Sequence, residues 1–245
     1  MFDWLKKKKE PAFNFSSIGT DMHSHILPGI DDGAKNLSDS LLLAARFKEL
    51  GYKKLIATPH IMADYFRNTP STVHKALDVL REGLLQNNID LEVNAAAEYY
   101  LDETFENKIE KKEVLTFGDK NYLLFELSYI NPPHNVFEVI AKMQDAGYQP
   151  VLAHPERYPY YYGSIESYEQ IRETGCLLQL NIISLTGYYG KSCKQTAEEL
   201  VDSLCIDFIG SDMHHLRHAD ALKESLHLDR VQQILAQPQM QNLLL

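Results

Sequence analysis

The chain has 245 residues, of which 44% are hydrophobic and 24% are charged, and its formal net charge is −10. This size and composition are typical of a globular protein with a sizeable core, and the acidic balance argues against nucleic acid as a partner. The three cysteines are an odd number without a Cys-x-x-Cys pair, which excludes a disulfide framework and predicts small buried apolar side chains.

Residues 1–17 form a basic, then aromatic and polar, lead-in with a run of four lysines at 6–9. No apolar segment follows the lysines, so they do not begin a secretory signal. We expect a solvated tail that touches an anionic membrane weakly at most. Residues 18–245 contain no linker, no composition shift and no apolar run long enough to span a membrane, which predicts a single domain.

From residue 18 onward, short apolar runs alternate with amphipathic helical patterns. The runs cover residues 18–23, 53–58, 91–97, 121–127, 149–153, 176–182 and 206–211. The helical patterns include one capped by Ser38 and one that begins at Thr69-Pro70, and they continue at 102–112, 136–146, 165–174, 195–204 and 219–236. This alternation indicates a parallel α/β fold. An open sheet binds its ligand at one switch point, whereas a barrel gathers side chains from many strand ends.

The first apolar run ends in a His-x-His pair, His23 and His25, and Asp31-Asp32-Gly33 follows in a glycine-rich turn. Side chains two residues apart on a strand share one face, so both imidazoles would point to the same place. Such a pair suits a transition metal, and the alternative is an ordinary buried or surface histidine pair.

Most of the other runs also end in residues that can bind a metal. Each has a structural explanation when taken alone, but strand ends of a barrel converge on one pocket. The pooled set contains five imidazoles and four carboxylates: His23, His25, Asp32, His60, Glu98, Glu126, His154, Asp212 and His214. Nine ligands exceed the four of one tetrahedral ion and fit two or three ions, and mixed nitrogen and oxygen ligands favour Mn, Fe or Zn.

Asp212-x-His214 repeats the period of two, and the sixth run ends in Asn181, a weaker candidate. The remaining histidines lie in or near helical patterns, and we expect them to be solvated, with two of them nearest the pocket (His215 and His218). These residues are His74, His134, His215, His218 and His227.

Taken in order over residues 18–236, these segments resemble the PHP (polymerase and histidinol phosphatase) superfamily. They are most similar to its bacterial manganese-dependent protein tyrosine phosphatases, which are linked to capsular and exopolysaccharide synthesis. The most specific segments are His23-Ser24-His25-Ile26-Leu27-Pro28-Gly29-Ile30-Asp31-Asp32-Gly33, Ala153-His154-Pro155-Glu156-Arg157-Tyr158 and Ser211-Asp212-Met213-His214. The resemblance implies a distorted (β/α)7 barrel with a metal site at the C-terminal rim of the strands.

The resemblance also implies that the nine residues bind two or three Mn²⁺ ions, with Asp31 as the alternative to Asp32. It implies that Arg157 and Arg217 are catalytic residues that bind phosphate. The expected activity is hydrolysis of a phosphate monoester by metal-activated hydroxide. The expected substrate is a phosphotyrosine protein, the tail of a bacterial tyrosine kinase of polysaccharide synthesis, met in the cytoplasm near the inner face of the membrane.

The sequence leaves open the role of one aromatic loop and the choice among several functions. The aromatic loop Tyr158, Tyr160, Tyr161 and Tyr162 either stacks on a phosphotyrosine ring or packs a surface loop. The alternatives to the tyrosine phosphatase are a small-molecule phosphatase for histidinol phosphate or a sugar phosphate, a nuclease that the net charge disfavours, and a non-catalytic metal-binding or kinase-docking module. The oligomeric state is not encoded in any pattern we recognise.

Overall fold

The computed structural model describes residues 11–245, so the lysine run at 6–9 lies outside the described residues. The strands in this part of the chain are β1 (Thr20–Ser24), β2 (Lys54–Ala57), β3 (His60–Ile61), β4 (Glu92–Ala95), β5 (Glu98–Tyr100), β6 (Tyr122–Glu126), β7 (Gln149–Ala153), β8 (Leu177–Asn181) and β9 (Phe208–Gly210). The helices are α1 (Leu37–Glu49), α2 (Pro70–Gln86), α3 (Glu103–Lys111), α4 (Val136–Asp145), α5 (Ile165–Glu173), α6 (Lys191–Asp202), α7 (Leu216–Ser225) and α8 (Asp229–Leu235).

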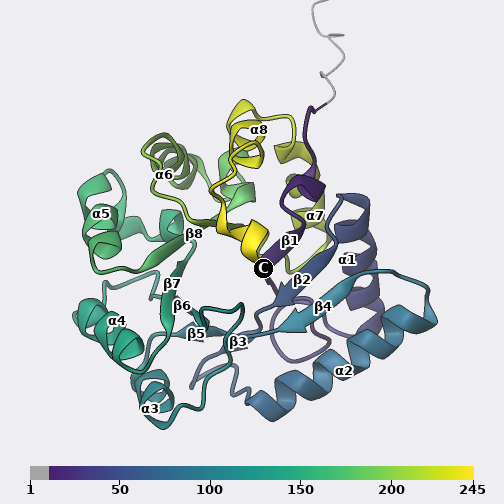
Figure 1. The fold of residues 1–245 in the computed structure, drawn as a ribbon, viewed down its shortest axis with the longest axis horizontal. Coiled ribbons are helices and arrows are strands. Elements are labelled where there is room, and N and C mark those ends of the chain that lie inside the picture. The colour runs from purple at the N-terminus through teal and green to yellow at the C-terminus, as the bar shows by residue number, and fades with distance from the viewer. Residues whose placement is uncertain (1–10) are drawn as a thin grey trace, which may run out of the picture.

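The strands form a closed ring of parallel neighbours (Figure 1). One sheet has the order β1-β2-β4 and the other has the order β3-β5-β6-β7-β8-β9. β3 continues the line of β2, and β5 continues the line of β4, because the same two segments pair with each other on both sides of the break. The ring closes where Asp212 N–H donates to the His23 carbonyl at 2.8 Å and His25 N–H donates to the Met213 carbonyl at 3.0 Å. The predicted barrel of seven strand–helix units is confirmed.

The helices surround the strands on the outside of the barrel, as Figure 1 shows in end view. Side chains along each strand alternate between these helices and the barrel interior, as the pleat requires. In β6, Leu123 and Phe125 pack in the large outer core, whereas Tyr122 and Leu124 belong to the smaller inner cluster. None of the described helices combines the length and the apolar character needed to cross a bilayer.

Several elements differ from their predicted bounds, among them α6, which begins at Lys191 rather than at residue 195. α1 begins at Leu37 with Asn36 as its N-cap, not Ser38, because the Asn36 side chain accepts from Asp39 N–H. The last helical region is two helices, since the backbone is extended at Leu228 between α7 and α8; the sequence there has no glycine or proline to signal the break. The third strand is interrupted before Glu98, which therefore begins β5.

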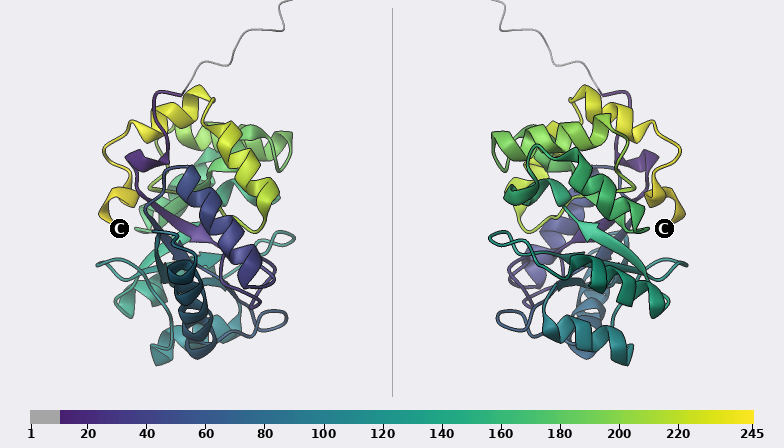
Figure 2. Two further views of the ribbon diagram at one scale, coloured as in Figure 1. Left: turned by 90° about the vertical axis from the view of Figure 1, so that its right-hand side faces the viewer. Right: turned by 90° about the vertical axis from the view of Figure 1, so that its left-hand side faces the viewer.

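The C-terminal segment lies at the end of the barrel where the strands begin. The 3-10 helix η5 (Gln241–Leu244) places the buried Asn242 side chain between two strands, where its amide donates to the carbonyls of Thr20 and Ile209 at 3.1 and 2.8 Å. The side views in Figure 2 show the C-terminus and the loop after β1 on opposite sides of the molecule. Phe15, from the predicted lead-in, is also buried and stacks on Tyr52 at 4.9 Å.

Candidate metal centre

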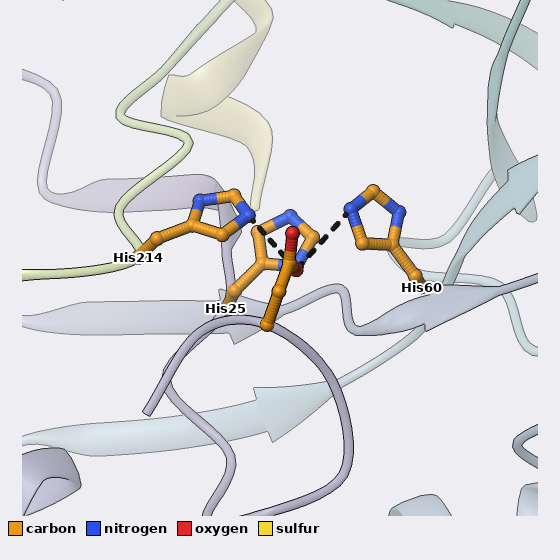
Figure 3. A group of neighbouring side chains, drawn as sticks. His25, His60 and His214 are labelled. Atoms are coloured by element: carbon orange, nitrogen blue, oxygen red, sulfur yellow. Dashed lines mark ion pairs between the residues drawn. The ribbon is translucent and has the colours of Figure 1, made fainter. Parts of the chain in front are cut away.

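The nine predicted ligands come together at the end of the barrel where the strands finish. Their donor atoms form four overlapping groups, and within each group all atoms lie within 4.8 Å of one another. The groups are His25-Asp32-His60-His214, His23-His154-Asp212, His23-His25-Glu98 and His60-Glu98-Glu126. Figure 3 shows the rings of His25, His60 and His214 turned toward one point.

Glu98 lies at the centre of this cluster. Its Oε2 is 3.2 Å from His23 Nε2, 3.3 Å from His25 Nε2 and 3.2 Å from His60 Nδ1. Its other oxygen, Oε1, is 2.8 Å from His154 Nε2. One fully buried carboxylate, supplied by the interruption between β4 and β5, therefore faces four imidazoles.

The two adjacent aspartates of the glycine-rich turn have different contacts. Asp31 Oδ2 is 2.8 Å from His25 Nδ1, which leaves Nε2 of that ring directed at the cluster. Asp32 Oδ1 instead faces His60 Nε2 at 3.6 Å and His214 Nε2 at 3.3 Å. Asp31 thus orients a ring from behind, as carboxylates commonly do for metal-binding histidines, and Asp32 is the one directed at the shared point.

His23 is oriented in the same way by an amide. Its Nδ1 lies 2.7 Å from Gln179 Oε1, so its Nε2 points at Glu98 and at Asp212 Oδ1, 3.5 Å away. Asp31 was expected only as the alternative ligand to Asp32, and Gln179 was not predicted at all. Gln179 lies on β8 with its side chain inside the barrel, and no motif in the sequence marks it.

Two of the gathered residues have a left-handed backbone, His154 with φ 34° and Asp212 with φ 49°. This conformation costs a residue with a side chain about 1–3 kcal/mol, so the surrounding contacts must hold it. The expected extended geometry of Asp212-x-His214 is therefore wrong: β9 ends at Gly210, and a turn brings Asp212 Oδ1 to 3.4 Å from His214 Nδ1.

Burial and nearby opposite charges shift the pKa values of the cluster in opposite directions. Burial alone would raise the pKa of Glu98, but the rings of His23 and His60 hold it well below its usual range. Burial would lower the pKa of His60, but the carboxylates of Glu98 and Glu126 raise it to about 9. Without metal, Glu98 is therefore anionic, and at neutral pH His60 carries a proton that a bound cation would displace.

The geometry of the cluster fits bound metal ions. The buried polar atoms that lack a hydrogen-bond partner include His60 Nδ1, Glu98 Oε2 and Glu126 Oε1, which form one of the four groups. His60 Nδ1 is 3.2 Å from each of the two oxygens. Ligands about 2.1 Å from a tetrahedral ion are about 3.4 Å apart, so these separations suit ions held between the side chains.

A cavity of about 540 Å³ opens directly onto the cluster. Arg157 lines it, with its guanidinium 4.9 Å from the centre of the Tyr129 ring and 4.4 Å from that of Tyr189. The same guanidinium pairs with Asp212 Oδ2 at 2.7 Å, so the carboxylate joins Arg157 to the cluster. The wall also contains Met62, Tyr65 and Phe66, and Phe66 stacks on His60.

Other predicted site residues lie elsewhere. Arg217 is exposed on α7 and lines an adjacent groove, not the cavity that contains Arg157. Tyr158 is fully buried: its hydroxyl donates to the Ala153 carbonyl and accepts from Leu127 N–H. It is part of the core rather than a surface for a ligand. His218 lies in the cavity wall, as expected of a pocket neighbour, but the prediction that it is solvated is wrong, because it is 7% exposed.

The aromatic residues of the cavity were not identified from sequence. Tyr65, Phe66, Tyr129 and Tyr189 come from three separate loops, and only the fold brings them to one wall. The tyrosine-rich segment after β7 was more conspicuous in the sequence, but Tyr160 and Tyr161 pack against each other, with ring centres 4.7 Å apart.

Residues 19–244 match the family model described as capsular polysaccharide synthesis, CpsB/CapC. The chain is 32% identical to the tyrosine-protein phosphatase YwqE from Bacillus subtilis over 197 residues, which cover 80% of this chain and 78% of that protein. It is 28% identical to the tyrosine-protein phosphatase CpsB from Streptococcus pneumoniae over 201 residues, 80% of this chain and 83% of that protein.

The fold has a close counterpart among solved structures. One from work on YwqE from Bacillus subtilis and CpsB from Streptococcus pneumoniae, described as unique metal-dependent tyrosine phosphatases, matches with a TM-score of 0.80 and 29% identity. The match covers 91% of this chain and 94% of that one. With the family model spanning nearly the whole barrel, the chain belongs to the CpsB/CapC family of capsular polysaccharide synthesis.

Proposed function

We propose that this protein is a metal-dependent protein-tyrosine phosphatase. The observation that carries the proposal is the buried cluster of imidazoles and carboxylates, with its unpartnered atoms, at the floor of a cavity that also presents Arg157. A negatively charged ester fits beside metal ions and a guanidinium. The names of the relatives and their metal dependence support the same reading.

The nine gathered residues would hold the metal, and two or three Mn²⁺ ions are the occupancy we infer. When bound, the ions activate water and neutralise charge on phosphorus-bound oxygens. Asp31 and Gln179 would keep His25 and His23 in the tautomers that direct Nε2 inward. Glu98 would help to hold the ions, because its carboxylate faces rings that belong to all four groups.

Arg157 would bind the phosphoryl oxygens. Its guanidinium is already held by Asp212 and by two tyrosine faces, so little freedom is lost when it pairs with an anion. A planar guanidinium can donate to two oxygens at once. The phenolate of tyrosine has a pKa of about 10 and leaves more readily than an alkoxide, which reduces the need for a strong general acid.

The aromatic wall supports an aryl ester as the substrate. Tyr65 is 78% exposed at the cavity and Phe66 stacks beside it on His60, so a phosphotyrosine ring can pack against them. Aromatic pairs contribute about 0.5–1.5 kcal/mol beyond burial. We infer that the protein substrate is a bacterial tyrosine kinase of polysaccharide synthesis, in keeping with the family description.

The test is turnover of a phosphotyrosyl peptide and of histidinol phosphate by the same preparation, before and after chelation and with Mn²⁺ restored. We expect the peptide to be hydrolysed with a kcat/KM at least about tenfold higher than that of histidinol phosphate, and chelation to remove both activities. Faster turnover of histidinol phosphate would favour a small-molecule phosphatase. Activity that survives complete metal removal would contradict the proposal.

A further inference from the structure

A second groove, of about 440 Å³, adjoins the cavity that contains Arg157. The two share His214 and His215 in their walls, so they are continuous at the rim of the barrel. The groove lies between the loop after β1 and the helices α1 and α7, which neighbour each other in Figure 1. A ligand held in the cavity can therefore extend into it.

The groove combines aliphatic and positively charged side chains. Leu42 and Leu216 are 52% and 42% exposed there, which is unusual for large apolar residues. Lys35 and Arg217 supply two positive charges against the single carboxylate of Asp39. Neither cation takes part in an ion pair within residues 11–245, although the chain as a whole has a net charge of −10. The groove is therefore a locally positive surface on a chain whose net charge is negative.

We propose that this groove binds the residues that flank the phosphotyrosine of a protein substrate, and that it selects an aliphatic side chain next to an acidic one. The aliphatic side chain would pack on Leu42 and Leu216, and the carboxylate would pair with Lys35 and Arg217. This inference rests on the proposed function, since it needs a phosphotyrosine in the cavity. It assigns Arg217 to substrate selection beside the reaction centre.

Two phosphotyrosyl peptides of equal length test the selection, one with Leu and Glu next to the phosphotyrosine and one with Gly and Lys. We expect a kcat/KM about tenfold higher for the acidic peptide, and the preference to weaken as salt rises. In Lys35→Glu, the ratio of kcat/KM on the acidic peptide to kcat/KM on p-nitrophenyl phosphate should fall about tenfold. Lys75→Glu, an equal charge change at an exposed position on α2 outside the groove, should keep the ratio.

Leu42→Asp gives a second measurement at a different residue of the groove. It removes the aliphatic contact and adds a carboxylate that repels the acidic peptide, so it should lower the same ratio. Equal kcat/KM for the two peptides, with normal turnover of both, would overturn the selection while leaving the phosphatase proposal standing. No turnover of either peptide by the Mn²⁺-loaded enzyme would overturn both. A change in sedimentation of Leu42→Asp, with the ratio unaltered, would show that the groove binds a second copy and would also overturn it.

Discussion

The interior of the barrel has two layers that differ in kind. Where the strands begin, it is filled by apolar side chains such as Met22, Ile56 and Phe208. Where they finish, it is filled by buried imidazoles and carboxylates. β6 contains both layers in one strand: Tyr122 and Leu124 face the apolar cluster, and Glu126, two residues later on the same face, belongs to the cluster of imidazoles and carboxylates.

One end of the barrel interior therefore contributes mainly to the stability of the fold, and the other end carries the groups that can do chemistry. Burial of apolar surface stabilises the layer where the strands begin, which we call the lower layer, without specific partners. In the layer where the strands finish, which we call the upper layer, each buried charge costs free energy unless an opposing group or a cation lies beside it. The lower layer is therefore expected to tolerate substitution at a cost in stability, and the upper layer at a cost in metal binding.

The largest effect should come from Glu98→Gln in the upper layer. This change removes the negative charge that faces four rings within 3.3 Å, so metal content and kcat/KM should both fall, the latter at least about 100-fold. Metal analysis and turnover of a phosphotyrosyl peptide measure the two. Glu173→Gln, an exposed position at the end of α5, serves as the control. Full metal content in Glu98→Gln would contradict the expectation that substitutions in the upper layer impair metal binding.

Arg157→Ala should lower kcat/KM about 100- to 1000-fold, because the phosphoryl oxygens lose a fixed charged donor, while metal content is kept. Arg157→Lys should recover only part of the activity, since an ammonium cannot donate to two oxygens as a fork does. Equal activity of Arg157→Lys and the unaltered enzyme would show that the guanidinium shape is unimportant.

In the lower layer, Phe208→Ala should reduce the free energy of unfolding by about 3–5 kcal/mol, because its fully buried ring leaves a cavity. Activity per folded molecule should stay unchanged. Leu85→Ala, at a side chain that is 79% exposed on α2, should change stability by less than about 0.5 kcal/mol. Denaturation curves followed by metal analysis of the folded fraction check both expectations, and loss of metal in folded Phe208→Ala would link the layers.

The smallest effect should come from Cys193, which belongs to neither layer. Burial raises the pKa of its thiol to about 12, so the thiol is protonated, and unreactive, across the neutral range and gains reactivity only as the pH approaches that value. Cys193→Ser should leave kcat/KM within about twofold. Loss of most of the kcat/KM in Cys193→Ser, together with inactivation of the unaltered enzyme by a thiol-alkylating reagent at pH 7, would reveal a cysteine mechanism.

Much of the upper layer could be predicted from the sequence, because its residues lie at strand ends. His23, Glu126 and Asp212 each lie at or next to the end of an apolar run, and such positions meet in a barrel, the architecture that the family resemblance implied. The bounds of α2 and α3 followed from Thr69 and Asp102, whose side chains cap the helices as expected. Those signals are local, so a single sequence contains them.

The parts that were missed depend on contacts between distant segments. Gln179 acts through the ring of His23, 156 residues away in the chain, and no spacing reveals this contact. Tyr129 and Tyr189 reach Arg157 from two different loops. The left-handed turns at His154 and Asp212 are held by surrounding packing rather than by local preference, so an extended backbone was the natural but wrong expectation for Asp212.

The most direct test is an anomalous difference map from crystals of the Mn²⁺-loaded protein, recorded at the manganese absorption edge. We expect peaks between the Glu98 carboxylate and the rings of His23, His25 and His60. A protein that hydrolyses phosphotyrosyl peptide in those crystals, but shows no peak at the rim of the barrel, would contradict the role we assign to the cluster.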